Sequence, residues 1–219
     1  MSNTIKWEAF GQKHIDYILK TKDCNANILE GAVRAGKTID NCIAFSLNLE
    51  YSQDKIHLAS GSTLANAKLN IGECNGFGLE YLFRGRCRWG KYKDNDALFV
   101  TTKSGEKIII FAGGGLANSY KKILGNSYGM WIATEINEHY DDEDSKISFV
   151  KVAFARMLAS KTNKFFWDMN PSNPNAKIYE WYIDLWAKQG LVGGYNYQHL
   201  NIFDNGAITE QRRLEIILK

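Results

Sequence analysis

The feature that most constrains this chain is the octet GAVRAGKT at residues 31–38, which matches the phosphate-binding loop pattern Gly-x-x-x-x-Gly-Lys-Thr. The apolar pair Ile28-Leu29 precedes the octet, and residues 38–51 after it carry apolar side chains at helical spacing. A strand, a glycine-containing loop and a helix in this order form the context in which such a loop binds phosphate. The sequence therefore predicts a nucleotide site between residues 28 and 51.

Each residue type in the octet has a physical role. Glycines allow the backbone to wrap closely around a phosphate, so that its N–H groups and the start of the following helix face the negative charge. The lysine reaches the β- and γ-phosphates, and the threonine hydroxyl binds Mg²⁺. ATP and Mg²⁺ are thus the predicted cofactors. The predicted nucleotide-binding residues are Gly31, Ala32, Val33, Arg34, Ala35, Gly36, Lys37 and Thr38.

Arg34, at the fourth position of the octet, has two interpretations on sequence alone. It can be a solvated loop charge. It can also be an arginine finger supplied in cis, which contacts the γ-phosphate and stabilises charge in the transition state.

A hydrolase with this loop also needs an apolar strand that ends in an acidic residue, which polarises water. The stretch GMWIATE at residues 129–135 fits, and it makes Glu135 the predicted catalytic carboxylate, with Glu138 in reserve. The usual ending is Asp-Glu, whereas this strand ends in Thr-Glu. Thr134 must then hold the metal through a water or leave that task to another group. We interpret the acidic run at 141–144 as a solvated loop or helix start.

Strands and helices are predicted to alternate along the chain, and this order indicates a mostly parallel sheet covered by helices on both faces. The 219 residues are 45% hydrophobic, with a net charge of +3 and four cysteines far apart, so zinc is not expected. No apolar run approaches the ~20 residues of a membrane span, and we expect a soluble intracellular protein. Predicted helices are 7–20, 38–51, 62–73 and 149–160; predicted strands are 55–60, 129–135 and 164–170, with a β-hairpin formed by 97–102 and 107–113.

Several stretches in one order resemble the ATPase domain of the large terminase subunit, the DNA-packaging motor of tailed bacteriophages. They are the octet with its internal arginine and residues 60–73, 108–138, 165–184 and 199–213. The last three include the acid strand, the segment DMNP and the stretch FDNGAI. The resemblance implies a P-loop NTPase of the ASCE type, with an added β-hairpin, that hydrolyses ATP to drive double-stranded DNA into a procapsid.

The resemblance also implies roles for particular residues. Arg34 is expected to be the cis arginine, Glu135 the catalytic carboxylate, and Asn170 part of the motif that couples hydrolysis to movement. Gln12 lies where the family places an adenine-reading glutamine, with Phe10 able to stack nearby. Plainer interpretations remain: a turn residue before proline for Asn170, and an ordinary N-terminal helix for Gln12.

The resemblance further implies an assembly. It assigns residues 1–205 to the ATPase domain and 206–219 to the start of a linker towards a nuclease domain, so no nuclease activity is expected from this chain. Expected partners are double-stranded DNA, the portal protein, the small terminase subunit and other copies in a ring, with a monomer in isolation, no membrane, and action in the host cytoplasm. The alternatives are a helicase-type ATPase, a phosphotransferase or a nucleotide-gated interaction module with little turnover.

The densest basic stretch is RGRCRWGKYK, at residues 84–93, in which basic residues alternate with Trp89 and Tyr92. Such a mixture suits a nucleic-acid surface, and a solvated variable loop explains it equally well. Lys121-Lys122 is a second, weaker candidate. The predicted DNA-binding residues are Arg84, Arg86, Arg88, Lys91 and Lys93.

Overall fold

Eight strands form a single sheet in the order β3-β4-β5-β2-β6-β7-β1-β8. This computed structural model describes residues 10–141, 147–191 and 193–217. The strands are β1 (Ala26–Gly31), β2 (Ile56–Gly61), β3 (Cys87–Tyr92), β4 (Asn95–Thr102), β5 (Gly105–Gly113), β6 (Met130–Ala133), β7 (Lys164–Met169) and β8 (Tyr195–Leu200). From β5 to β8 every neighbouring pair is parallel, while β3 and β4 add an antiparallel edge.

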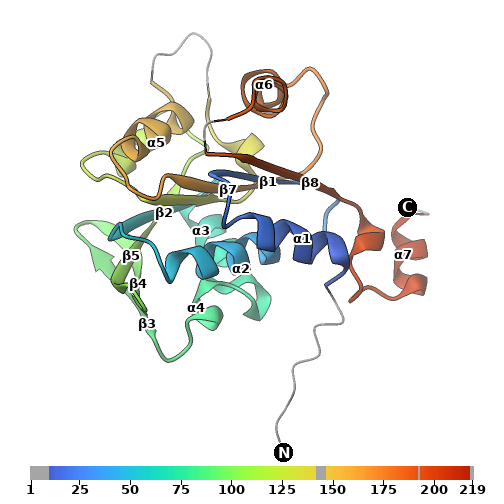
Figure 1. Cartoon of the computed structure of the whole chain (residues 1–219), viewed down its shortest axis with the longest axis horizontal. Coiled ribbons are helices and arrows are strands. Elements are labelled where there is room, and N and C mark those ends of the chain that lie inside the picture. The colour runs from blue at the N-terminus through green and yellow to red at the C-terminus, as the bar shows by residue number, and fades with distance from the viewer. Residues whose placement is uncertain (1–9, 142–146, 192, 218–219) are drawn as a thin grey trace, which may run out of the picture.

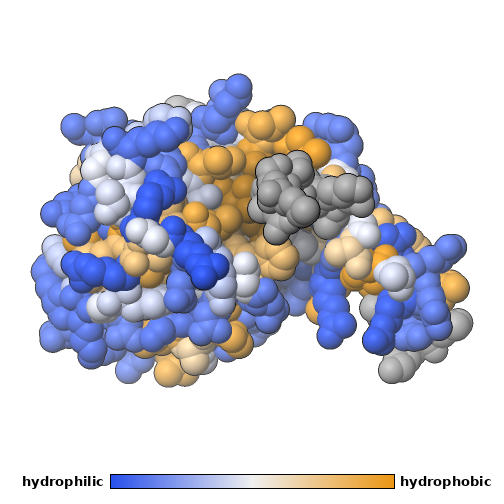
Figure 2. Space-filling view, turned by 90° about the horizontal axis from the view of Figure 1, so that it is seen from below, coloured by the Kyte–Doolittle hydropathy of each residue, from blue (hydrophilic) through white to orange (hydrophobic). Residues whose placement is uncertain are grey.

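Helices cover both faces of the sheet, as Figure 1 shows. The helices are α1 (Gln12–Lys20), α2 (Lys37–Leu49), α3 (Leu64–Ala67), α4 (Leu79–Leu82), α5 (Phe149–Met157), α6 (Asp184–Gln189) and α7 (Glu210–Ile217). Helices α1 to α4 lie on one face and α5 and α6 on the other, while α7 stands to one side (Figure 1). Figure 2, seen from the side of α1 and α2, shows hydrophilic residues over most of that face, with some hydrophobic residues between them.

The central strands are short and buried on both sides, which explains their continuous apolar sequences. All residues of β1 and β6 are buried. Trp131, Trp167 and Phe149 belong to the core beneath α5, while Phe45 of α2 and Phe166 belong to the core on the opposite face. Parallel strands covered by helices on both faces are expected to have this pattern.

The predicted architecture is confirmed, with the parallel sheet and the hairpin of β4 and β5 in place. Local differences occur. Within the predicted helix at 62–73, α3 covers Leu64–Ala67 and a π-helical segment covers Lys68–Glu73. Strand β8 has no counterpart among the predicted strands. The described part of the predicted helix at 7–20 begins as α1 only at Gln12, and residues 7–9 lie outside the described residues. In the described part of the chain, no helix is both long and apolar enough to cross a membrane.

Candidate nucleotide-binding site

The octet forms the loop between β1 and α2, and its two glycines have the conformations that this turn requires. Gly31 has φ of 152°, and an added Cβ would come within 1.8 Å of the Leu200 carbonyl oxygen of β8. Gly36 has φ of 97° and precedes the first residue of α2. Arg34 also has a positive φ, of 64°. At both glycine positions a residue with a side chain would be strained.

Lys37, the first residue of α2, lies inside the loop. Its Nζ donates hydrogen bonds to the carbonyl oxygens of Gly31 and Ala32, both at 2.8 Å, and to Oδ1 of Asn170 at 3.1 Å. Burial lowers the pKa of Lys37, and the negative charges of Asp168, Glu135 and Glu30 oppose that shift. The lysine is thus held where a phosphate chain would meet the loop.

The register of three parallel strands brings distant residues to the same edge of the sheet. Ala133 of β6 pairs with Trp167 of β7, and Met169 of β7 pairs with Glu30 of β1. The residues that follow these pairs therefore come together at the carboxyl ends of the strands, where α/β sheets bind ligands. They are Thr134, Asp168, Asn170 and Gly31.

Glu135, the predicted catalytic carboxylate, follows the end of β6 in a strained backbone conformation, with φ of 51° and ψ of 55°. Its side chain is half-buried, and its negative charge acts on Lys37. Its backbone N–H donates to Oδ1 of Asp168 at 3.0 Å. Left-handed conformations of non-glycine residues cluster at functional sites, because the surrounding structure must hold them in place.

Asp168, near the end of β7, is an acidic residue of this site that was not predicted from the sequence. It is 2% exposed, and the hydroxyl of Thr134 donates to its Oδ1 at 3.2 Å. Burial raises the pKa of Asp168, and the Glu135 N–H, Lys37, Thr38 and Thr134 act against that rise. An acidic residue at the end of an otherwise apolar strand, just before Asn170-Pro171, was the signal available in the sequence.

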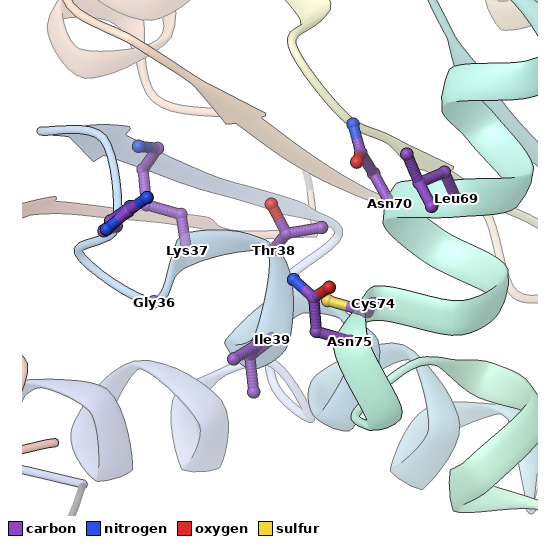
Figure 3. A pocket seen from close by; sticks show the side chains of 9 residues that line it. Gly36, Lys37, Thr38, Ile39, Leu69, Asn70, Cys74 and Asn75 are labelled. Atoms are coloured by element: carbon purple, nitrogen blue, oxygen red, sulfur yellow. The ribbon is translucent and has the colours of Figure 1, made fainter.

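A pocket of about 270 Å³ lies between the loop and the segment after α3. Figure 3 shows Gly36, Lys37, Thr38 and Ile39 on one side, with Leu69, Asn70, Cys74 and Asn75 on the other. Arg34 is exposed and also lines this pocket. Its backbone carbonyl accepts a hydrogen bond from Nδ2 of Asn205 at 2.7 Å, which ties the loop to the stretch before α7.

Gln12 begins α1 and is exposed, and its side-chain amide donates to Asp16 Oδ1 at 2.7 Å. It is not among the residues that line the pocket. Its neighbour His14 is buried instead, and lies against the loop. His14 Nδ1 is 2.6 Å from Oδ2 of Asp40 in α2, and an added Cβ at Gly36 would lie 3.2 Å from the His14 ring. The buried pair of His14 and Asp40 therefore packs against the loop at Gly36.

The two other acidic features of the sequence lie apart from the pocket. Glu138 is exposed and lines a different pocket, together with Lys121 and Lys122. Asp141 accepts hydrogen bonds from Ser148 and Tyr182, at 2.5 and 2.6 Å, while residues 142–144 lie outside the described residues.

Six residues of the basic stretch at 84–93 form the edge strand β3, Cys87–Tyr92, while residues 84–86 and Lys93 lie in turns or bends. Arg86 pairs with Glu50 at 2.8 Å, and the Arg88 guanidinium lies 4.1 Å from the centre of the Phe99 ring. Lys93 donates to Asn126 at 3.1 Å, and Lys91 lines the pocket that also contains Lys121 and Lys122. The solvated-loop interpretation is therefore wrong for residues 87–92, while DNA binding stays a prediction.

The oxygen atoms around Thr38 and Asp168 fit a magnesium ion. Mg²⁺ prefers oxygen ligands and is usually held by one or two carboxylates, nucleotide phosphates and water. Asp168 Oδ2 is buried without a hydrogen-bond partner in the structure. The described residues contain no group of three or more His, Cys, Asp or Glu side chains able to hold a metal by themselves.

Similar folds occur in the large terminase of a thermophilic bacteriophage. One crystal form of that protein matches with a TM-score of 0.78 at 19% identity, covering 94% of this chain and 49% of that chain. Its complex with ADP matches with a TM-score of 0.77 at 19% identity and the same coverage. Its complex with ATP-γ-S gives 0.74 at 18% identity, with 94% and 48% covered.

No protein-family model and no curated protein sequence matches the chain. The chain spans about half the length of the terminase structures, so the likeness concerns one part of that protein. At 18 to 19% identity the likeness establishes the fold. The chain has the P-loop α/β fold found in the large terminase of a bacteriophage.

Proposed function

We propose that this chain is the ATPase motor domain of a viral large terminase, which hydrolyses ATP to drive double-stranded DNA into a procapsid. The observation that carries the proposal is the contact of Lys37 with both the loop and Asn170, beside the carboxylates of Glu135 and Asp168. The likeness to a terminase that was solved with ADP and with ATP-γ-S supports it.

In this proposal the backbone N–H groups of the octet and the start of α2 bind the phosphates, and Lys37 neutralises their charge. Glu135 accepts a proton from the water that attacks the γ-phosphate. Thr38 and Asp168 would hold Mg²⁺, which would supply positive charge to the phosphate oxygens when bound. Arg34 stabilises the charge of the transition state from its position in the loop.

Asn170 links the phosphate site to the segment after β7. Its Oδ1 accepts from Lys37 at 3.1 Å, so a change in the contacts of Lys37 alters those of Asn170. A polar contact of this kind can report the state of the γ-phosphate to a moving element. We propose that DNA, the portal protein, the small subunit and further copies in a ring are the partners, in the host cytoplasm.

The direct test is ATP hydrolysis by wild-type chain, Glu135→Gln and Glu138→Gln. Both substitutions replace a carboxylate with an amide within one short segment, and the exposed Glu138 lines a different pocket. We expect Glu135→Gln to lower kcat by about 10²–10⁴-fold with ATP binding retained, because general-base catalysis contributes factors of this size. Equal turnover by wild type and Glu135→Gln would contradict the role of Glu135. A wild-type chain that binds no ATP would contradict the whole proposal.

A further inference from the structure

Asp168 is held firmly by one of its two carboxylate oxygens. Oδ1 accepts the Thr134 hydroxyl at 3.2 Å and the Glu135 backbone N–H at 3.0 Å. These two donors come from the end of β6, so they fix the carboxylate of β7 between the two strands. Thr134 and Glu135, which follow β6, therefore donate hydrogen bonds to a carboxylate that belongs to the neighbouring strand β7.

The second oxygen, Oδ2, is buried and has no hydrogen-bond partner in the structure. No ion pair of Asp168 is present among the described residues. Burying a carboxylate oxygen without a partner is unfavourable, because the oxygen loses its contacts with water. Asp54 shows the contrast: its Oδ1 and Oδ2 accept the backbone N–H groups of Lys161 and Thr162, at 3.1 and 2.8 Å.

The surroundings of Asp168 show which ligand its free oxygen suits. Helix α2, whose first two residues are Lys37 and Thr38, packs against β7, the strand that carries Asp168. Thr38 carries the hydroxyl that a phosphate-binding loop offers to a metal, and Thr38 also lines the pocket. A hard cation that arrives with the nucleotide would supply the missing partner.

We propose that Asp168 supplies the carboxylate of the Mg²⁺ site, together with the Thr38 hydroxyl, and that Thr134 positions Asp168 for this task. The proposal rests on the proposed function, because the metal arrives with the nucleotide. The usual Asp-Glu ending would place the metal-binding carboxylate after β6, whereas in this arrangement Asp168 provides it from the end of β7. Thr134 keeps its place on the acid strand but contributes a hydrogen bond in place of a negative charge.

The test is isothermal titration calorimetry of ADP binding to the 219-residue chain, with Mg²⁺ or with EDTA. Asp168→Asn keeps an oxygen that can accept from Thr134 and Glu135 but removes the charge. Mg²⁺ should raise the ADP affinity of the wild-type chain. We expect this increase to be about tenfold smaller in Asp168→Asn, because removal of a group that holds or orients a metal typically costs a factor of this size. ADP affinity in EDTA should be unchanged, since the loop itself is intact.

Asp54→Asn is the matched control, because Asp54 also accepts backbone N–H groups but lies at the opposite end of β2 from the site. It should keep the full Mg²⁺ gain. A purely structural role for Asp168 predicts equal losses with Mg²⁺ and with EDTA, and that result would overturn the proposal. A wild-type chain that binds ADP without any gain from Mg²⁺ would also overturn it, whereas one that binds no ADP would overturn the proposed function. Should Asp168→Asn fail to fold, Asp168→Ser takes its place with the same expected result.

Discussion

The central strands and the edge strand β3 show how distance along the sequence and distance in space differ. At the carboxyl ends of β6, β7 and β1, residues 134, 168, 170 and 37 meet, although they are up to 133 positions apart. In the edge strand β3 and its flanks, basic residues that are close in the sequence contact different parts of the chain: Arg86 pairs with Glu50, Arg88 lies over Phe99, and Lys93 donates to Asn126. The register of parallel strands brings residues that are distant in the sequence to the same edge of the sheet. Within one strand, in contrast, the side chains of successive residues point to opposite faces.

The largest effect is expected from Arg34→Ala. A cis arginine finger contributes about 10³–10⁵-fold to kcat, so this substitution should reduce kcat by at least about 10³-fold. ATP affinity should change little, because the backbone N–H groups and Lys37 remain. Steady-state ATPase assays with separately measured ATP affinity check this. If turnover survives in Arg34→Ala, Arg34 is a solvated loop charge.

Lys37→Ala is expected to have a smaller effect than Arg34→Ala, and this effect should be a loss of ATP affinity. Removing a charged donor to phosphate costs about 1.5–3 kcal/mol, which corresponds to roughly 10- to 150-fold weaker binding. Lys164→Ala is the matched control, because Lys164 Nζ also donates to two carbonyl oxygens, those of Thr21 and Lys22, at 2.6 Å. Calorimetry should show unchanged ATP affinity for Lys164→Ala. Equal losses in the two variants would indicate destabilisation of the fold and not loss of a phosphate contact.

The buried pair beneath the loop predicts a pH-dependent stability. Burial lowers the pKa of His14, but the hydrogen bond and the charge of Asp40 more than compensate, so the pKa is raised from 6.5. A raised histidine pKa gives stability that is complete below about pH 6.5 and is lost as pH rises through the folded-state pKa. Urea unfolding should therefore show a wild-type advantage over His14→Gln that is greatest near pH 6, about 1.5–3 kcal/mol for a charged hydrogen bond, and then declines.

The exposed His199 of β8 provides the control for this measurement. His199→Gln makes the same change at an exposed position and should alter the free energy of unfolding at pH 6 by no more than about 0.5 kcal/mol. A His14→Gln difference that stays constant or grows with pH would contradict the stabilising role of the protonated pair.

The smallest effects are expected in the basic region. Because the basic side chains are distributed, each substitution to Ala at Arg84, Arg88 or Lys91 should weaken DNA binding only modestly. Each should reduce the slope of log affinity against log salt by about 1, the contribution of one phosphate contact. The exposed Lys161 serves as the control. Salt titrations that leave all three slopes equal to wild type would exclude this region from the DNA interface.

Much of the fold could be predicted because the central strands are buried on both faces and their apolar runs are unmistakable. Strand β8, with the sequence YNYQHL, lacks such a run and was missed. Strand β3 was not recognised, because alternating Arg, Trp and Lys side chains are also typical of an exposed loop.

The candidate site was predictable where chemistry is local in the sequence and not where it depends on register. The phosphate-binding loop is formed by consecutive residues, 31–38, and Glu135 directly follows an apolar run and Thr134. Asp168 is 34 positions from Thr134, and only the pairing of β6 with β7 places them in contact. The missing acidic group at Thr134 was recognised from the sequence, but its replacement on the neighbouring strand was not.

A crystal structure of the chain with Mg²⁺ and a non-hydrolysable ATP analogue would show whether the carboxyl ends of β1, β6 and β7 form one ATP site. We expect the phosphates in the loop of residues 31–38, with the γ-phosphate between Lys37 and Glu135. Phosphates bound elsewhere, or a γ-phosphate that faces Glu138 in place of Glu135, would contradict it.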